Sequence, residues 1–390
     1  MYEMKIALRH VLSRRRQAFF SILAVALAVA VITVMMGLLT GFQNELIQAS
    51  IENSPHIIIN PKSDQEEFIH LYKQLAEQLA EKEGVIAVSP KYLGQAALEY
   101  RENAEAVSLQ GVEPLAEDRV LRVSKDVIAG DFKALSHSKS GILLGDKLAE
   151  NLEVKVGDRV DAGFPGSKPT SFKVIGLFHT GTPADEALAY ARLDSVQAFF
   201  NEKGVVSSIG IRVNDPYQAE SLAMSIEEET GFEAVSWIEA NAEILNLLNT
   251  QKVFVNLFYL MIYGIAGFGI ANTLITVVAQ RTPEIGILKA MGASKKSITK
   301  VFLFQALLLG NAGLCLGCVL GYLTTLYFQR YYIIDVPQEM YFGLQTLPIE
   351  LDFLNFALAA IFALLVNLLA GVYPARKAAG LDAVEAIESA

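Results

Sequence analysis

The sequence is poor in cysteine, histidine and charge. Two cysteines among 390 residues cannot build a disulfide scaffold, and 19% charged residues is below the roughly 25% of soluble domains. The five histidines form no H-x-x-H or H-E-x-x-H pair, so we expect no metal site. G-x-x-x-x-G-K-[ST] and G-x-S-x-G are also absent, so we expect neither ATP hydrolysis nor other catalysis by this chain. No catalytic residue and no bound cofactor are predicted.

The low charge content is due to four apolar runs. Residues 18–42, 253–280, 301–329 and 353–373 contain no Asp, Glu, Lys, Arg or His. Twenty-five helical residues measure roughly 37 Å, which is enough to cross a hydrocarbon core of ~30 Å. The alternative for each run is a buried core helix, and for the first run a signal peptide. The first run is too long for a signal peptide. We therefore predict an α-helical membrane protein with four transmembrane helices.

Basic residues in the short flanking segments predict the orientation of the spans. The amphipathic segment 1–17 and the link 281–300 carry an excess of Lys and Arg, and Arg376 and Lys377 begin the tail 374–390. The link 330–352 has one arginine against four acidic residues. Because basic flanks stay in the cytoplasm, we predict a multi-pass protein of the cell (inner) membrane. Both termini and 281–300 are then cytoplasmic, and 43–252 and 330–352 are extracytoplasmic.

Residues 43–252 have the composition of a water-exposed domain. They contain 19 Lys/Arg and 33 Asp/Glu, and this negative balance argues against nucleic acid as a partner. Alternating strand and helix patterns predict a large extracytoplasmic α+β domain between the first and second spans. Its predicted parts are two β-α-β halves near 55–110 and 206–237, a β-rich insert at 111–205, and helical stalk ends at 43–50 and 238–252.

One helix and two strands of this domain have specific patterns. An amphipathic helix is indicated by Phe68, Leu71, Tyr72, Leu75 and Leu79, which share one helical face. Residues 156–160 and 171–178 are predicted to form a hairpin, joined by the glycine- and proline-rich link 161–170.

Residues 278–294 carry the end signals of a short helix followed by a second one. Thr282 is the expected N-cap, and Pro283 fits the first helical position. Gly292 suits a left-handed residue after the helix, and Ser294 is expected to cap the next helix. The sequence therefore predicts a rigid cytoplasmic elbow between the second and third spans.

The elbow is also unusually apolar, with Ile285, Ile287, Leu288 and Met291. A simple return loop with caps is the alternative interpretation, but it requires neither this length nor these side chains. Exposed apolar side chains on a cytoplasmic turn favour a docking surface for another protein.

Here the sequence resembles a known family. Residues 281–294, R-T-P-E-I-G-I-L-K-A-M-G-A-S, are similar to the coupling segment of FtsX-like ABC transporter permeases. The resemblance is greatest to lipoprotein-releasing (LolC/LolE-type) permeases and extends to the macrolide-exporter (MacB-type) permease cores. It covers essentially the whole chain and includes residues 8–16, 41–46, 55–59, 181–185, 373–379 and 382–387. The C-terminal motif departs from the family at Ala383, where proline is usual.

The resemblance implies a permease subunit that rests on a dimer of separate ABC ATPase subunits, which bind ATP and Mg. A second permease copy or paralogue completes the assembly. In that family the motion of the ATPases passes through the elbow and stalk to the outer domain. That domain acts on a lipidated or amphipathic substrate. Permeases that hand cargo to a periplasmic carrier or adaptor use a long hairpin hook, and the link 161–170 is short for that role.

Three sets of residues are candidates for function. Those for ATPase coupling are Arg281, Glu284, Gly286, Lys289, Gly292 and Ala293. Those for an apolar substrate surface near the outer mouth are Met35, Met36, Leu39, Phe42, Phe254, Leu257, Phe258 and Met261, for which ordinary packing between spans is the alternative. Gly313, Gly317 and Gly321 form a small-residue stripe for helix packing, within one subunit or at a dimer seam.

Two other classes of function stay open on the sequence. The same mechanical core suits an FtsX-like regulator of a cell-wall hydrolase or sensor, with no transport. A weaker alternative is an adhesion or receptor ectodomain on spans that need no ATPase.

Overall fold

The computed structural model describes residues 2–62, 66–165, 169–331 and 348–388. These residues divide into two compact units. A helical unit comprises Met1–Asn44, Leu247–Ile334 and Thr346–Ala390, and a mixed unit is dominated by Glu45–Asn246. Most of the predicted 330–352 loop lies outside the described residues, as does the centre of the 161–170 link.

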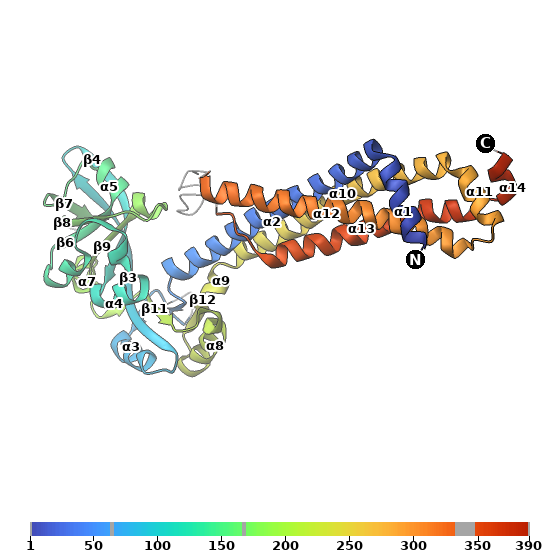
Figure 1. The fold of residues 1–390 in the computed structure, drawn as a ribbon. Coiled ribbons are helices and arrows are strands. Elements are labelled where there is room, and N and C mark those ends of the chain that lie inside the picture. Colours follow the sequence, from blue (N-terminus) through green and yellow to red (C-terminus); the bar gives the residue numbers. More distant parts are fainter. Residues whose placement is uncertain (1, 63–65, 166–168, 332–347, 389–390) are drawn as a thin grey trace. The chain divides into compact units, whose positions relative to one another are not determined.

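Seven helices build the described part of the helical unit (Figure 1). They are α1 (Tyr2–Ser13), α2 (Arg15–Asn53), α10 (Ala242–Gln280), α11 (Thr282–Ala290), α12 (Lys295–Tyr331), α13 (Phe353–Gly380) and α14 (Ala383–Glu388). Helices α2, α10, α12 and α13 are long and apolar enough to cross a membrane. Each contains one of the four predicted runs. Helix α2 and helix α10 extend beyond those runs into the mixed unit without a break.

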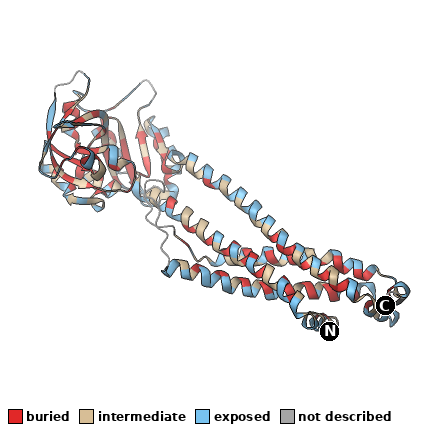
Figure 2. Cartoon of the chain, turned by 90° about the horizontal axis from the view of Figure 1, so that it is seen from above, coloured by how far each residue is buried: buried red, intermediate tan, exposed pale blue. Residues whose placement is uncertain are grey.

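Small residues determine how closely the long helices pack. A Cβ atom on Gly313 would lie 2.6 Å from the Cβ of Val25, and one on Gly317 would lie 2.7 Å from the carbonyl oxygen of Ala26. Gly321 faces Thr33 in the same way. The predicted stripe therefore lies against α2 of the same chain. In Figure 2 the buried residues of this unit form inward stripes, while the outer faces are pale blue.

The mixed unit is built on a ten-stranded sheet with the order β12-β1-β11-β3-β4-β9-β6-β8-β5, and β7 pairs with β3 and β8. These strands are β1 (Ile57–Asn60), β3 (Val85–Tyr100), β4 (Asn103–Val112), β5 (Val127–Gly130), β6 (Gly141–Gly145), β7 (Arg159–Gly163), β8 (Thr170–Phe178), β9 (Leu188–Arg192), β11 (Ser208–Val213) and β12 (Glu233–Ser236). A second, two-stranded sheet joins β2 (Ile69–His70) to β10 (Val205–Val206).

Short helices cover the sheet. They are α3 (Tyr72–Ala80), α4 (Pro114–Leu121), α5 (Asp146–Asn151), α6 (Ala184–Ala187), α7 (Leu193–Phe199), α8 (Ala219–Thr230) and α9 (Trp237–Ala240), with 3-10 turns η1 (Val123–Lys125), η2 (Phe132–His137) and η3 (Pro216–Gln218). The main apolar core contains Ile57 and Ile59 of β1, Leu75 and Leu79 of α3, and Ile226 of α8. This unit has the α+β composition that the sequence predicts.

Strand β3 is the longest strand and joins the two parts of the sheet. Its first half pairs with β11, and its second half pairs with β4 and β7. Strand β1 lies between β11 and β12. The two predicted β-α-β halves therefore interleave their strands in one sheet.

Two local predictions differ from the structure. Helix α3 begins at Tyr72, because Leu71 adopts a left-handed conformation (φ 53°) and is exposed. Phe68 and Leu71 are thus not on the buried helical face. Strand β7 begins at Arg159 because Asp158 accepts a hydrogen bond from the Lys155 amide at 2.9 Å and Gly157 takes φ +105°, so these residues form a turn.

The buried His56 predicts a pH dependence for the mixed unit. The Val213 amide donates to its Nδ1 at 3.2 Å, and Nε2 lies 3.2 Å from the Ile51 carbonyl oxygen. Burial, followed by the charge of Arg212, lowers the pKa of His56. The unfolded chain therefore binds a proton near the ordinary pKa of about 6.5, where folded His56 stays neutral. Stability is present above that pH and decreases as the pH falls through it.

We expect hydrogen exchange at the β1 and β11 amides of the full chain to become faster at pH 5.5 than at pH 7.5, after correction for intrinsic rates. His56→Gln should remove this difference, since glutamine does not titrate. Equal protection of the wild-type amides at both pH values would contradict the assignment.

Candidate coupling site

The elbow is a helix, α11, that follows α10 after one residue. Arg281 departs from helical geometry (φ −109°, ψ 12°), although its amide still donates to the Val277 carbonyl oxygen at 3.0 Å. Thr282 is the first residue of α11, and its hydroxyl donates to the Val278 carbonyl at 3.0 Å. The predicted N-cap role of Thr282 is therefore wrong. Its hydroxyl bonds back to the preceding helix, as threonine side chains commonly do within helices.

The other end of α11 follows the sequence signals. Gly292 adopts φ +98°, which favours glycine. The adjacent Ala293 amide donates to the Leu288 carbonyl at 3.0 Å, and the Ser294 hydroxyl accepts from the Ser297 amide at 3.2 Å. The end of α11 and the start of α12 are therefore both capped, which makes the elbow rigid.

Two of the predicted coupling residues lie inside the chain's own packing. Lys289 Nζ donates to the carbonyl oxygens of Ala379, at 3.3 Å, and Leu381, at the end of α13. A Cβ on Gly286 would lie 3.0 Å from side-chain atoms of Ala386 and Ile387 on α14. Helix α11 is therefore fastened to α13 and α14 through these two residues.

The apolar side chains of the elbow divide between the interior and the surface. Ile285 is buried in a cluster with Phe302 and Ala378, and Leu288 packs against that cluster. Ile287 and Met291 are 50% and 72% exposed. Helix α14 adds two exposed apolar residues, Val384 and Ile387. We call Ile287, Met291, Val384 and Ile387 the coupling face.

Arg281 and Glu284 connect the elbow to α1. They form an ion pair with each other, and Arg281 also donates to the Ser13 hydroxyl at 3.1 Å. His10 Nε2 lies 3.9 Å from a Glu284 carboxylate oxygen. Burial and the charge of Arg281 lower the pKa of His10, against the opposing effect of Glu284. The N-terminal helix is thus part of the site, although no contact residue in it is predicted from the sequence.

The eight candidates for a substrate surface occupy different environments. Met36 and Leu39 line a small cavity of about 110 Å³ between α2 and α10, together with Tyr259. Met35 is exposed on α2, and Phe42 is half-buried. The four α10 candidates are all exposed: Phe254, Leu257, Phe258 and Met261. The described residues of this chain leave this part of α10 largely uncovered.

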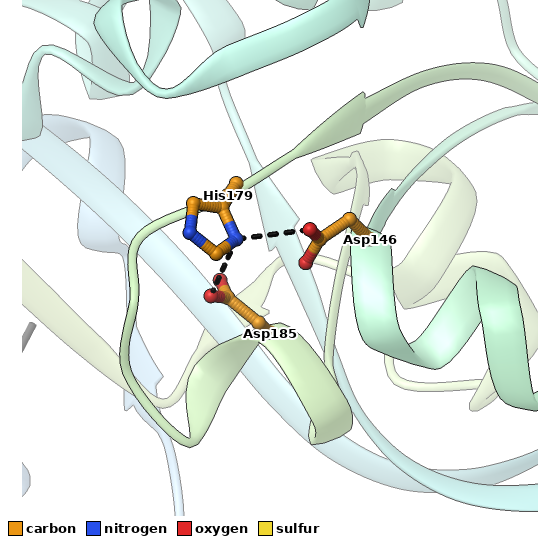
Figure 3. A group of neighbouring side chains, drawn as sticks. All are labelled: Asp146, His179 and Asp185. Carbon is orange, nitrogen blue, oxygen red and sulfur yellow. Dashed lines mark ion pairs between the residues drawn. The ribbon is translucent and has the colours of Figure 1, made fainter. Parts of the chain in front are cut away.

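In the mixed unit, the fold brings together three polar residues that sequence spacing could not link (Figure 3). His179 Nδ1 lies 2.9 Å from Asp146 Oδ2 and 3.3 Å from Asp185 Oδ2. The three side chains could reach one metal ion. However, Asp185 already accepts hydrogen bonds from the Thr180 amide and hydroxyl and from the Gly181 amide. Its main role in the structure is to hold the turn between β8 and α6, and the absence of a metal stays a prediction.

Comparison with family models assigns both units to known types. Residues 18–229 match the MacB-like periplasmic core domain, and residues 256–383 match the FtsX-like permease C-terminal model. The chain belongs to the FtsX-like ABC transporter permeases that carry a MacB-like periplasmic core domain.

Relatives of similar length support this assignment. The chain is 25% identical to the lipoprotein-releasing system transmembrane protein LolC of Neisseria meningitidis serogroup B, over 98% of each chain. It is 26% identical to LolE of Haemophilus influenzae, over 95% of this chain and 94% of that protein. Among solved structures, the periplasmic region of MacB from Actinobacillus actinomycetemcomitans matches 50% of this chain and 95% of that one, at 14% identity and a TM-score of 0.38.

The tight contact at Gly286 gives a prediction. We expect Gly286→Leu to destabilise the chain by ~1–3 kcal/mol, because the new side chain would overlap α14. Gly264→Leu is the matched control, since a Cβ at Gly264 meets no atom within 4 Å. Thermal unfolding of the detergent-solubilised chain measures both. An equal decrease in the two variants would contradict the close packing of α11 on α14.

Proposed function

We propose that the chain is the permease subunit of an ABC transporter driven by a separate ATPase dimer, which binds the ATP and Mg. In this proposal the ATPase docks on the coupling face and moves α11. The motion passes along the long helices to the extracytoplasmic domain, which releases a lipidated or amphipathic substrate. A second copy of the chain, or a paralogue, completes the permease.

One observation carries this proposal: the elbow is rigid on its inner side and apolar on its outer side. Lys289 and Gly286 fix α11 to α13 and α14, so a force on α11 would act on those helices too. Ile287 and Met291 are exposed apolar side chains on the segment that we place in the cytoplasm. Such side chains are typical of a protein interface.

The proposed location is the inner membrane, with both termini in the cytoplasm. The basic flanks of the four candidate spans support this orientation. The matched core domain is described as periplasmic, which agrees with an extracytoplasmic mixed unit.

Two features support an amphipathic substrate. The exposed apolar residues of α10 offer a surface for acyl chains or for the second permease copy. The related LolC and LolE proteins belong to lipoprotein-releasing systems. The central residues of the 161–170 link lie outside the described residues, so docking of a periplasmic carrier rests on the sequence alone.

Negative charge on the coupling face should weaken ATPase binding. We expect Ile287→Asp combined with Met291→Asp to reduce co-purification of the ATPase about tenfold or more, because both side chains would be desolvated at the interface. Lys296→Asp is the control, since it makes the same change in net charge at an exposed position in the first turn of α12. Equal recovery of the ATPase with all three proteins would argue against docking on this face.

Reconstitution separates a transporter from a regulator. Proteoliposomes with the chain, its ATPase and a diacylated lipoprotein should release the lipoprotein when ATP is added. The double aspartate variant should fail and Lys296→Asp should succeed, because only the former disturbs the coupling face. Absence of release with every lipidated or amphipathic cargo, despite ATPase binding, would favour the regulator of a cell-wall hydrolase or sensor.

A further inference from the structure

The first half of β3 has an open edge. Residues 85–91 pair with β11 on one side, whereas β4 pairs with β3 only from Lys91 onward. Within the described ranges, no strand lies beside residues 85–90 on the β4 side. Pro90 lies in this stretch, which agrees with an edge position because proline cannot donate to a neighbouring strand.

The main-chain groups of Val88 face this open edge. Groups along a strand point alternately to its two sides. The Ser207 amide donates to the Lys91 carbonyl at 2.8 Å, so the main-chain groups of Lys91 point toward the β11 side. By alternation, the main-chain groups of Ser89 also point toward β11, and those of Val88 point away from it. A register shift between Arg212 and Val213 leaves Ile86 without a partner in β11.

Helices on both faces of the sheet turn this edge into the floor of a groove. Helix α3 packs on one face, where Tyr72 and Tyr92 share a core. Helix α4 lies on the other face, where Lys91 Nζ is 2.7 Å from a carboxylate oxygen of the buried Glu117. The groove between them has a volume of about 860 Å³, and Val88 and Pro90 line it.

The lining of the groove suits a polypeptide. Ile86 and Leu115 are apolar side chains that are 56% and 53% exposed. Three basic and three acidic residues also line it: Lys73, Arg119, Arg192, Glu77, Glu113 and Asp194. This balance of charge does not select an anionic or cationic ligand, and the polar lining does not suit an acyl chain. An extended main chain is complementary to a strand edge that has free hydrogen-bonding groups.

We propose that this groove binds the extended linker of a lipidated cargo protein by adding it as a strand to β3 at Val88. The identity of the occupant rests on the proposed function. In strand addition the affinity comes from main-chain hydrogen bonds, which every sequence without proline can offer. It would therefore let one permease accept cargo proteins whose linkers differ in sequence.

Photo-crosslinking of the full chain in complex with its ATPase tests this proposal. p-Benzoylphenylalanine replaces Leu115 on the groove wall. The probe is a diacylglyceryl-cysteine followed by a short biotinylated linker of Ser, Thr, Val and Gln. A second probe carries N-methyl groups on alternate linker amides, which removes main-chain donors and keeps the side chains. We expect crosslinking of the second probe to be about tenfold weaker.

Two controls locate the effect at the edge. The same photoreactive residue at Ile128, which is exposed on the opposite edge strand β5, should give no crosslink. Val88→Pro removes the amide donor, whereas Val88→Ala keeps it, so only the proline variant should lose crosslinking from position 115. If Val88→Pro does not fold, the N-methylated probe makes the same test with an unchanged β3.

The possible outcomes are distinct. Equal crosslinking of the two probes would overturn strand addition. Crosslinking in membranes to a folded partner protein, and not to the probe, would overturn the cargo assignment. Absence of any crosslink while ATP-dependent release continues would overturn the groove and leave the proposed function intact. Failure of the wild-type complex to bind its ATPase or release cargo would instead overturn the proposed function.

Discussion

The contact on which the helical unit depends is the one between Lys289 and the end of α13. A cation placed on the carbonyl oxygens of Ala379 and Leu381 satisfies groups that a helix end leaves without partners, and it complements the negative end of the helix dipole. The same contact joins the turn after α10 to the end of α13. Gly286 also packs against α14. Together the two contacts make the elbow part of the helix bundle, so it cannot move as an independent loop.

This arrangement changes the meaning of the most specific motif in the sequence. The pattern around residues 281–294 identifies the segment, but its distinctive residues make contacts within the chain. Glu284 pairs with Arg281, Lys289 binds the end of α13, and the absence of a side chain at Gly286 lets α14 pack closely. The residues left exposed are the less distinctive Ile287 and Met291. A motif can thus define the geometry of a docking element, while neighbouring apolar positions supply its contact surface.

The elements that depend on local composition could be predicted from the sequence, and those that depend on pairing could not. The four long helices follow from charge-free runs, and Gly292 follows from the need for a positive φ. The position of β1 between β11 and β12 has no local signal, because its partner residues lie about 150 to 180 positions away in the sequence. The meeting of Asp146, His179 and Asp185 likewise depends on the register of the sheet. Thr282 shows another limit of the sequence. Its hydroxyl could accept from an amide of α11 as an N-cap or donate to a carbonyl of α10, and only the path of α10 selects the bond to Val278.

An open strand edge is a hazard that proteins usually limit, and β3 has several of the known protections. The edge is short, it carries Pro90, and a register shift at Ile86 interrupts its regular pairing. Residues of α3 and α4 line the groove at this edge, which hinders the approach of a flat sheet. These features would hinder aggregation but still admit a single extended chain. In the register of β3 and β4, pairing as far as Val88 would require β4 to continue three residues past Val112, to position 115. The chain instead turns at Pro114, and this early turn keeps the groove open.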